Sequence, residues 1–290
     1  MNVINTNISS MKAANASTQA GKALGTAMER LSTGKRINSA KDDAAGLAIA
    51  TSMTSQVRGM NQGIRNANDG ISLAQTAEGA LNEVTNMLQR QRELTVQASN
   101  GTYSADDKTN LAAEMDALNT QIQSVLNNTE FNGSKLFAGG ESAATPGTLD
   151  PAVENKITIQ AGANASDTVE INLGAGLANN AAFIAATGTF GVDVTDLAGD
   201  GSELALFDDA IKVISTTRAN LGASQNQLES AVNNLSSNIT NLSDARSRIE
   251  DTDYSAETTA LAKAQILSQA SGAMLAQANQ SQQNVLSLLK

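Results

Sequence analysis

Residues 207–249 read FDDAIKVISTTRANLGASQNQLESAVNNLSSNITNLSDARSRI, and their apolar side chains recur in alternating steps of four and three. Of the 13 positions in this seam, only Arg218, Gln225 and Arg246 are polar. Such spacing predicts a long helix with one narrow apolar stripe, which is stable only when it packs against another stripe.

A second seam of the same kind lies far upstream. Its positions are Met53, Val57, Met60, Ile64, Ala67, Ile71 and Ala74, followed after another step of three by Ala77, Leu81, Val84 and Leu88. Two successive steps of three are a stammer, which locally overwinds a coiled coil or moves the seam to a new neighbour. We therefore expect the chain to fold back so that two distant segments pair.

Shorter elements are expected between and before these seams. Ser104 and Asp107 have the spacing of a capping box, and a third seam follows at Leu111, Met115, Leu118, Ile122 and Val125. Ser39 and Asp42 have the same spacing, which predicts a helix from about Asp42 with two acids in its first turn. Residues 156–173 alternate apolar and polar side chains on both sides of AGANASD, which predicts a β-hairpin.

The two ends of the chain contain few charges. Residues 1–28 contain Lys12 and Lys22 alone, and residues 256–290 contain Glu257, Lys263 and Lys290. Ordering a residue costs about 1–2 kcal/mol, whereas a buried methylene returns only about 0.8 kcal/mol. Because the terminal faces are rich in alanine, we expect these helices to be largely disordered in the monomer and to be completed by neighbouring subunits.

The last helix is expected to present Ala264, Leu267, Met274, Ala278, Val285 and Leu288, with Ser271 and Ser281 as interruptions. Over both terminal helices, the apolar side chains expected to make contacts between subunits are Ile4, Ile8, Met11, Leu24, Leu31, Ile266, Leu267, Met274, Leu275, Val285, Leu288 and Leu289.

Composition argues against several classes of function. A net charge of −10 opposes nonspecific binding to nucleic acid and weakens attraction to anionic membranes. The chain has no cysteine and no histidine, so it has no thiolate site and lacks the usual zinc ligands. The N-terminus has no basic apolar leader, and no segment is apolar enough to span a membrane. We expect no active site and no cofactor.

Two groups of charged residues each have two possible explanations. Asp42–Asp43 and Asp106–Asp107 are better explained by helix starts than by acid–base chemistry, since nothing nearby could raise the pKa of one carboxyl. Lys35, Arg36 and Lys41 could contact acidic groups of a neighbouring subunit or lie in a solvated linker.

Three long motifs carry a resemblance to a known family. They are LSTGKRINSAKDDAAGLAIA (31–50), TAEGALNEVTNMLQRQRELTVQASNGT (76–102) and SRIEDTDYSAETTALAKAQILSQASGAMLAQANQSQQNVLSLLK (247–290). Each resembles bacterial flagellin. The resemblance implies a mainly α, discontinuous coiled-coil rod with both termini in an inner helical pair and a small β-hairpin insert. The implied domains are 1–43 with 248–290 (terminal), 44–138 with 203–247 (rod) and 139–202 (insert).

The resemblance also implies a function and partners. It implies export, unfolded, through the flagellar type III apparatus and assembly outside the cell into an open helical filament for swimming. The implied partners are further copies of the chain, an export chaperone, and cap and junction proteins. A host Toll-like receptor is implied too, through Arg90, Leu94 and Glu114; the charges of Arg90 and Glu114 are also explained as a solvated helix surface.

Two rival functions remain. A hook–filament junction protein shares terminal helices of this kind, and a secreted coiled-coil adhesin would share the rod. The small insert at 139–202 argues against a binding head, and the completeness of the rod motifs favours flagellin.

Overall fold

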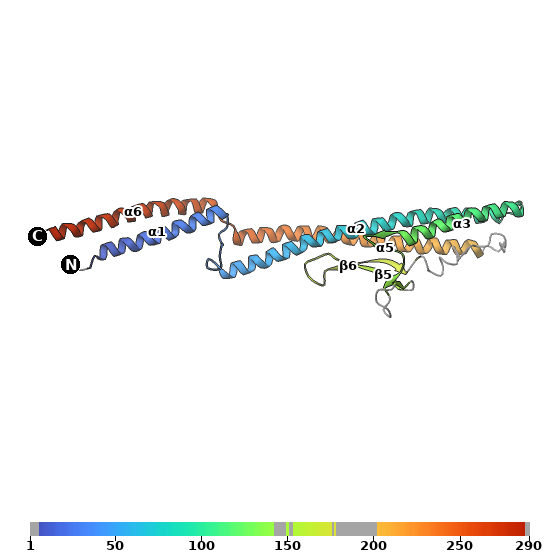
Figure 1. Ribbon diagram of the computed structural model, residues 1–290, viewed down its shortest axis with the longest axis horizontal. Helices are drawn as coiled ribbons and strands as arrows, with labels where there is room; N and C mark the ends of the chain where they lie inside the picture. Colours follow the sequence, from blue (N-terminus) through green and yellow to red (C-terminus); the bar gives the residue numbers. More distant parts are fainter. Residues whose placement is uncertain (1–5, 142–148, 151–152, 176, 178–201, 288–290) are drawn as a thin grey trace. The chain divides into compact units, whose positions relative to one another are not determined.

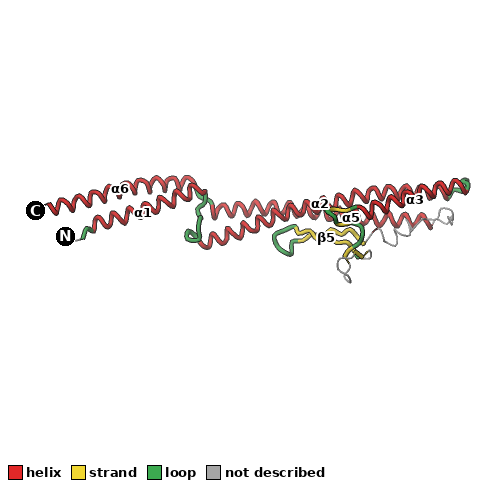
Figure 2. Tube along the Cα trace, viewed as in Figure 1, coloured by secondary structure: helices red, strands yellow, loops and turns green. Residues whose placement is uncertain are grey.

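The computed structural model describes residues 6–141, 149–150, 153–175, 177 and 202–287. Helices dominate it: α1 (Ile8–Thr33), α2 (Ala44–Ala98), α3 (Ala105–Asn128), α5 (Ser202–Glu250) and α6 (Tyr254–Ser287) (Figure 1). The strands form three antiparallel pairs: β1 (Glu130–Phe131) with β2 (Ser134–Lys135), β3 (Gly140–Glu141) with β4 (Leu149–Asp150), and β5 (Glu154–Gln160) with β6 (Thr168–Ala175) (Figure 2). The predicted fold class, mainly helical with a β-hairpin, is confirmed.

The chain forms two compact units. One joins the two ends of the sequence, Met1–Val57 and Thr240–Lys290, and the other is Arg58–Ile239. We call them the terminal unit and the central unit. Their boundaries fall inside α2 and α5, whereas the predicted domain boundary at 43/44 coincides with the start of α2 and the one at 247/248 lies three residues before the end of α5. The first turns of α2 and the last turns of α5 therefore belong to the same unit as α1 and α6.

The two long seams are buried as predicted. In the central unit Phe207, Ile214, Leu221 and Leu228 of α5, and Ala74, Ala77, Leu81, Val84 and Leu88 of α2, are fully buried in one core.

The polar seam positions of α5 all find partners on α2. Gln225 Nε2 donates to Glu78 Oε2 at 3.1 Å, and the Arg218 guanidinium lies 4.0 Å from the same carboxylate. In the terminal unit Arg246 Nη1 donates to Thr54 Oγ1 at 3.3 Å. Three interruptions in an apolar pattern are thus satisfied polar contacts between the same two helices, which helps to fix their register.

The start of α3 is confirmed and the start of α2 is not. Ser104 and Asp107 form a reciprocal capping box, each side chain accepting from the other's backbone N–H. At α2, however, the helix begins at Ala44 and Asp43 is its cap, because Asp43 Oδ1 accepts from Gly46 N at 2.8 Å. Asp42 instead closes a turn before the helix, where it accepts from the N–H groups of Asn38 and Ser39.

The hairpin β5–β6 packs closely on α2 through glycines. Ile157 pairs with Ile171 and Ile159 with Val169 in the register of the hairpin. A Cβ added at Gly63 of α2 would lie 2.8 Å from the backbone carbon and oxygen of Ala161. Glycine inside a helix costs about 1 kcal/mol relative to alanine, and here it permits the close approach of two backbones.

This packing gives opposite signs to two glycine-to-alanine substitutions in α2. Gly63→Ala is expected to destabilise the central unit by about 1–3 kcal/mol, because its methyl group meets backbone that cannot move aside cheaply. Gly79→Ala, whose Cβ would meet nothing within 4 Å, is expected to stabilise by up to about 1 kcal/mol. Urea unfolding of both variants compares them directly, and equal shifts of the same sign would contradict the packing.

The turn at Asp42 is expected to depend on pH. Hydrogen bonds from the backbone N–H of Ser39 and of Asn38 hold the pKa of the Asp42 carboxyl below its ordinary value of 3.8. Because the pKa is lower in the folded chain, the ionised carboxylate stabilises the turn. This stabilisation is complete above the pKa of the unfolded chain, about 3.9, and it is lost as the pH falls through the folded pKa. An NMR titration of the Asp42 carboxyl should give a midpoint below that of an unstructured peptide. Asp42→Asn should remove the pH dependence of the Ser39 amide signal, and an ordinary or raised midpoint would contradict the assignment.

Candidate assembly surfaces of the terminal helices

Helices α1 and α6 pack antiparallel along a seam of small side chains (Figure 1). Asn7 Nδ2 donates to the Ala278 carbonyl at 3.1 Å near one end, and Arg30 lies 3.8 Å from Glu257 near the other. The buried positions recur every seven residues: Ala13, Ala20 and Ala27 in α1, and Ala264, Ser271 and Ala278 in α6. Half-buried positions alternate with them: Ser10, Ser17, Leu24 and Leu31 in α1, and Leu261, Ser268 and Leu275 in α6.

This seam corrects the face predicted for the last helix. Ser271 is 2% exposed and lies within the seam, whereas Leu267 and Met274 are 49% and 57% exposed. The Ser271 hydroxyl donates to the Ser268 carbonyl at 3.0 Å, so its burial leaves no unsatisfied group. Small side chains at the buried positions let the two helices approach closely, and Leu267 and Met274 are left outside.

The predicted contact residues divide into three groups. Exposed on the pair are Ile8, Met11, Ile266, Leu267 and Met274. Leu24, Leu31 and Leu275 are half-buried between α1 and α6 of the same chain. Val285 lies in α6, while Ile4, Leu288 and Leu289 lie outside the described residues.

Two further exposed side chains, Met28 and Tyr254, were not among the predicted contacts; both are 57% exposed. The alanines that recur every seven residues in α1 could have predicted the exposure of Met28. Met28 follows Ala27 directly, so its side chain lies beside the seam and not within it.

A shallow groove of about 570 Å³ runs along one side of the pair. Ala13 and Ala278 belong to the seam and line it, and Met274 lies beside them. Its other lining residues are Ser9, Lys12, Ala16, Gln277 and Ser281. The groove is largely apolar and open, so it is a surface for packing rather than a pocket for a small molecule.

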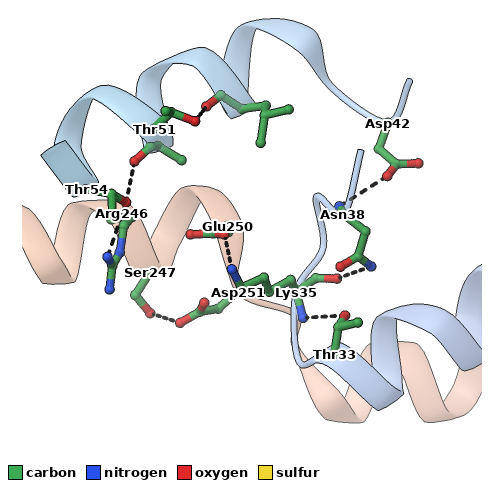
Figure 3. Close-up of polar contacts among 12 residues, drawn as sticks. Thr33, Lys35, Asn38, Asp42, Thr51, Thr54, Arg246, Ser247, Glu250 and Asp251 are labelled. Atoms are coloured by element: carbon green, nitrogen blue, oxygen red, sulfur yellow. Dashed lines mark hydrogen bonds and ion pairs between the residues drawn. The ribbon is translucent and has the colours of Figure 1, made fainter. Parts of the chain in front are cut away.

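The segments that leave α1 and enter α6 are joined by a short bridge of backbone and side chains (Figure 3). Lys35 and Asp251 form an antiparallel β-bridge, with Arg36 N donating to the Glu250 carbonyl at 2.6 Å and Thr252 N to the Gly34 carbonyl at 3.0 Å. We call residues 34–36 and 249–252 the linker bridge. Backbone hydrogen bonds of this kind fix the two crossing segments to each other.

Two of the three basic linker residues act within the chain. Lys35 Nζ lies 2.6 Å from Glu250 Oε1, a carboxylate whose side chain is 14% exposed, and Arg36 Nη2 donates to the Ile249 carbonyl at 2.7 Å. Lys41 is exposed. Lys35 and Arg36 therefore make contacts inside the linker, which neither explanation predicted.

The residues implied in receptor recognition lie at the α2–α3 contact of the central unit. Arg90 Nη2 is 2.9 Å from Glu114 Oε1, and both side chains are about half exposed. Leu94 is 1% exposed and belongs to the core, so its side chain offers no surface to a receptor in the folded chain. The implied contact at Leu94 is corrected accordingly: this residue supports the helix that carries Arg90.

Among the described residues no group of three or more acidic, histidine or cysteine side chains could hold a metal ion. None of the described helices has the length and apolar character to cross a bilayer.

Comparison with known proteins gives one consistent family. The bacterial flagellin N-terminal helical region matches residues 4–142, and the bacterial flagellin C-terminal helical region matches residues 204–289. Flagellin of Bacillus subtilis is 45% identical over an alignment of 305 positions, and flagellin C of Vibrio cholerae is 37% identical over one of 372; each alignment, gaps included, covers 99% of both chains. The crystal structure of Bacillus cereus flagellin is 30% identical, covers 59% of this chain and 88% of that one, and has a TM-score of 0.45. The chain belongs to the bacterial flagellin family, whose members are extracellular structural subunits that polymerise into the flagellar filament.

Proposed function

We propose that the α1–α6 pair is the element through which this flagellin joins its neighbours, and that the outer faces of the pair are covered by other copies of the chain. The observation that carries this proposal is the position of the large apolar side chains: Ile8, Met11, Ile266, Leu267 and Met274 all lie outside the seam. A monomer that exposes several such side chains on one element has an apolar surface that association would remove from water.

The geometry of the pair favours an open polymer. The exposed faces of α1 and α6 have different sequences, and the proposed contact joins the α1 face of one copy to the α6 face of the next. Unlike surfaces give head-to-tail contacts, which continue as a helical filament when the rotation does not close. Long filaments are the expected product, whereas short, capped oligomers would favour the hook–filament junction protein.

The seam itself supports completion by neighbours. Alanine and serine bury little area, so the α1–α6 pair gains less from packing than the central unit, whose core contains Phe207, Leu81 and Leu88. A chain with weak terminal helices would suit export in an unfolded state by the flagellar type III apparatus. An export chaperone, a cap and junction proteins are proposed as partners on the same basis.

Receptor recognition is proposed on a narrower surface than the sequence implied. Arg90 and Glu114 are exposed and paired across α2 and α3, and Glu93 lies 3.3 Å from the same guanidinium. Hydrogen bonds from Arg90 to Glu114 and Glu93 raise the pKa of the guanidinium, so Arg90 stays charged. A Toll-like receptor would meet a fixed charged pair here.

Hydrogen exchange should separate the two units. In the verified monomer we expect amides of α1 and α6 to exchange well before those of α2 around Leu81 and Leu88, since the terminal seam is made of small side chains. In the filament the same terminal amides should become protected. Equal protection of both units in the monomer would contradict a pair that needs its neighbours.

A substitution on the outer face tests assembly directly. Ile266 is 66% exposed, so Ile266→Asp should leave the monomer folded. In a contact between copies it would lose about 1.5–3 kcal/mol of apolar burial, which raises the critical concentration for polymerisation by at least about tenfold. Gln227→Asp, at an exposed position of α5, adds the same charge and serves as the matched control. Sedimentation and electron microscopy in increasing salt measure both, and normal filaments from Ile266→Asp would overturn the proposal.

A further inference from the structure

The methionines of this chain divide sharply by exposure. Met11, Met28 and Met274 are 63%, 57% and 57% exposed, and all three lie in α1 or α6. Met60 and Met115 are 6% and 5% exposed within the chain's apolar packing. Met53 and Met87 are half-buried, and Met1 lies outside the described residues. The exposed thioethers are thus concentrated on the pair that we propose as the assembly element.

These sulfur atoms are the accessible targets for a two-electron oxidant. The chain has no cysteine, so thioethers are its only sulfur groups. With hydrogen peroxide the methionine sulfur takes up one oxygen atom and loses two electrons, while the O–O bond breaks and the peroxide is reduced to water. The product is methionine sulfoxide, a polar and chiral group in place of a flexible apolar one.

The surroundings of these methionines make the change consequential. Met274 lines the groove of the terminal pair beside Ala13 and Ala278, where it is the largest apolar side chain. Methionine also accounts for three of the exposed large apolar side chains of the pair, beside Ile8, Tyr254, Ile266 and Leu267. A sulfoxide oxygen covered by an apolar neighbour would lose its hydrogen bonds to water and gain no donor in their place, so its burial would cost free energy.

We propose that Met11, Met28 and Met274 are oxidation sites that control polymerisation: sulfoxide at these positions in the free subunit blocks its entry into the filament. The proposal rests on the proposed function, because it needs the outer faces of α1 and α6 to be contact surfaces. Oxidation is expected to depend on the state of assembly, because methionines that are exposed in the free subunit become covered in the polymer. Oxidant therefore acts before assembly, and a finished filament resists the same dose.

The test starts from the full-length chain. Monomer is treated with hydrogen peroxide, and peptide mass spectrometry should show oxygen at Met11, Met28 and Met274 before Met60 and Met115. The critical concentration for polymerisation should then rise at least about tenfold. Treatment with methionine sulfoxide reductases A and B, which together reduce both sulfoxide epimers, should restore it. Preformed filaments given the same dose should show less oxygen at the three sites.

Variants assign the effect to these positions. In Met11→Leu/Met28→Leu/Met274→Leu, the ratio of critical concentrations with and without peroxide should fall close to one. In the matched control Met53→Leu/Met87→Leu, the ratio should stay as high as in the parent chain. The reductase experiment uses the unaltered chain and so decides the matter even where a variant folds poorly.

Two negative results are distinguishable. Monomer that carries all three sulfoxides and polymerises normally, while Ile266→Asp still blocks assembly, would overturn the oxidation sites alone. Normal polymerisation of Ile266→Asp would instead overturn the proposed function and the inference that rests on it.

Discussion

The close packing of α1 against α6 through alanine and serine is the constraint on which the terminal unit depends. Residues as small as Ala20 and Ser271 allow two helices to lie together, but they bury little surface. Because small side chains fill the buried positions of the seam, its leucines are only half-buried, and Ile266, Leu267 and Met274 lie outside it. A subunit built in this way can pair its ends only weakly, and it leaves an apolar surface for association.

The central unit follows the opposite rule. Its seam contains Phe207, Leu221 and Leu228, which are fully buried, and its polar positions are paired with Glu78 across α2 and α5. The hairpin is held on α2 by close backbone contact at Gly63. This unit needs no neighbour to complete its core. In the terminal unit the linker bridge joins the crossing segments by backbone hydrogen bonds, so α1 ends and α6 begins at a fixed point.

Much of the fold was predictable because large apolar side chains determine it. The seams from Met53 and Phe207, the cap at Ser104 and the hairpin at 156–173 each rest on a strong local signal, and each is confirmed. The face of α6 was not predictable in the same way. Hydrophobicity alone predicts that Leu267 and Met274, and not Ser271, face α1. The close approach of the two helices instead requires a small residue at the contact, and Ser271 is the one that is buried.

Other details depend on contacts that sequence spacing does not contain. The spacing of Ser39 and Asp42 predicts the start of α2, and only the backbone path shows that Asp43 is the cap. Leu94 lies within a motif that resembles a recognition surface, yet it faces the core. Gln91 is polar, so the sequence alone would place it at the surface. It is buried because α3 packs on α2, and its Nε2 donates to the Met115 carbonyl at 3.2 Å.

The distribution of charge completes the physical account of assembly. The central unit carries 21 acidic and 9 basic side chains, whereas the terminal unit carries 8 acidic and 10 basic ones. The central unit therefore carries a net charge of −12 and the terminal unit one of +2, so like-charge repulsion between copies acts in the central unit. Salt screens that repulsion over a Debye length of about 10 Å at 0.1 M, but it does not weaken apolar contacts. One chain thus joins a strongly negative central unit to a terminal unit that carries little net charge. At low salt, repulsion between central units opposes assembly, whereas the apolar faces of the terminal helices favour it.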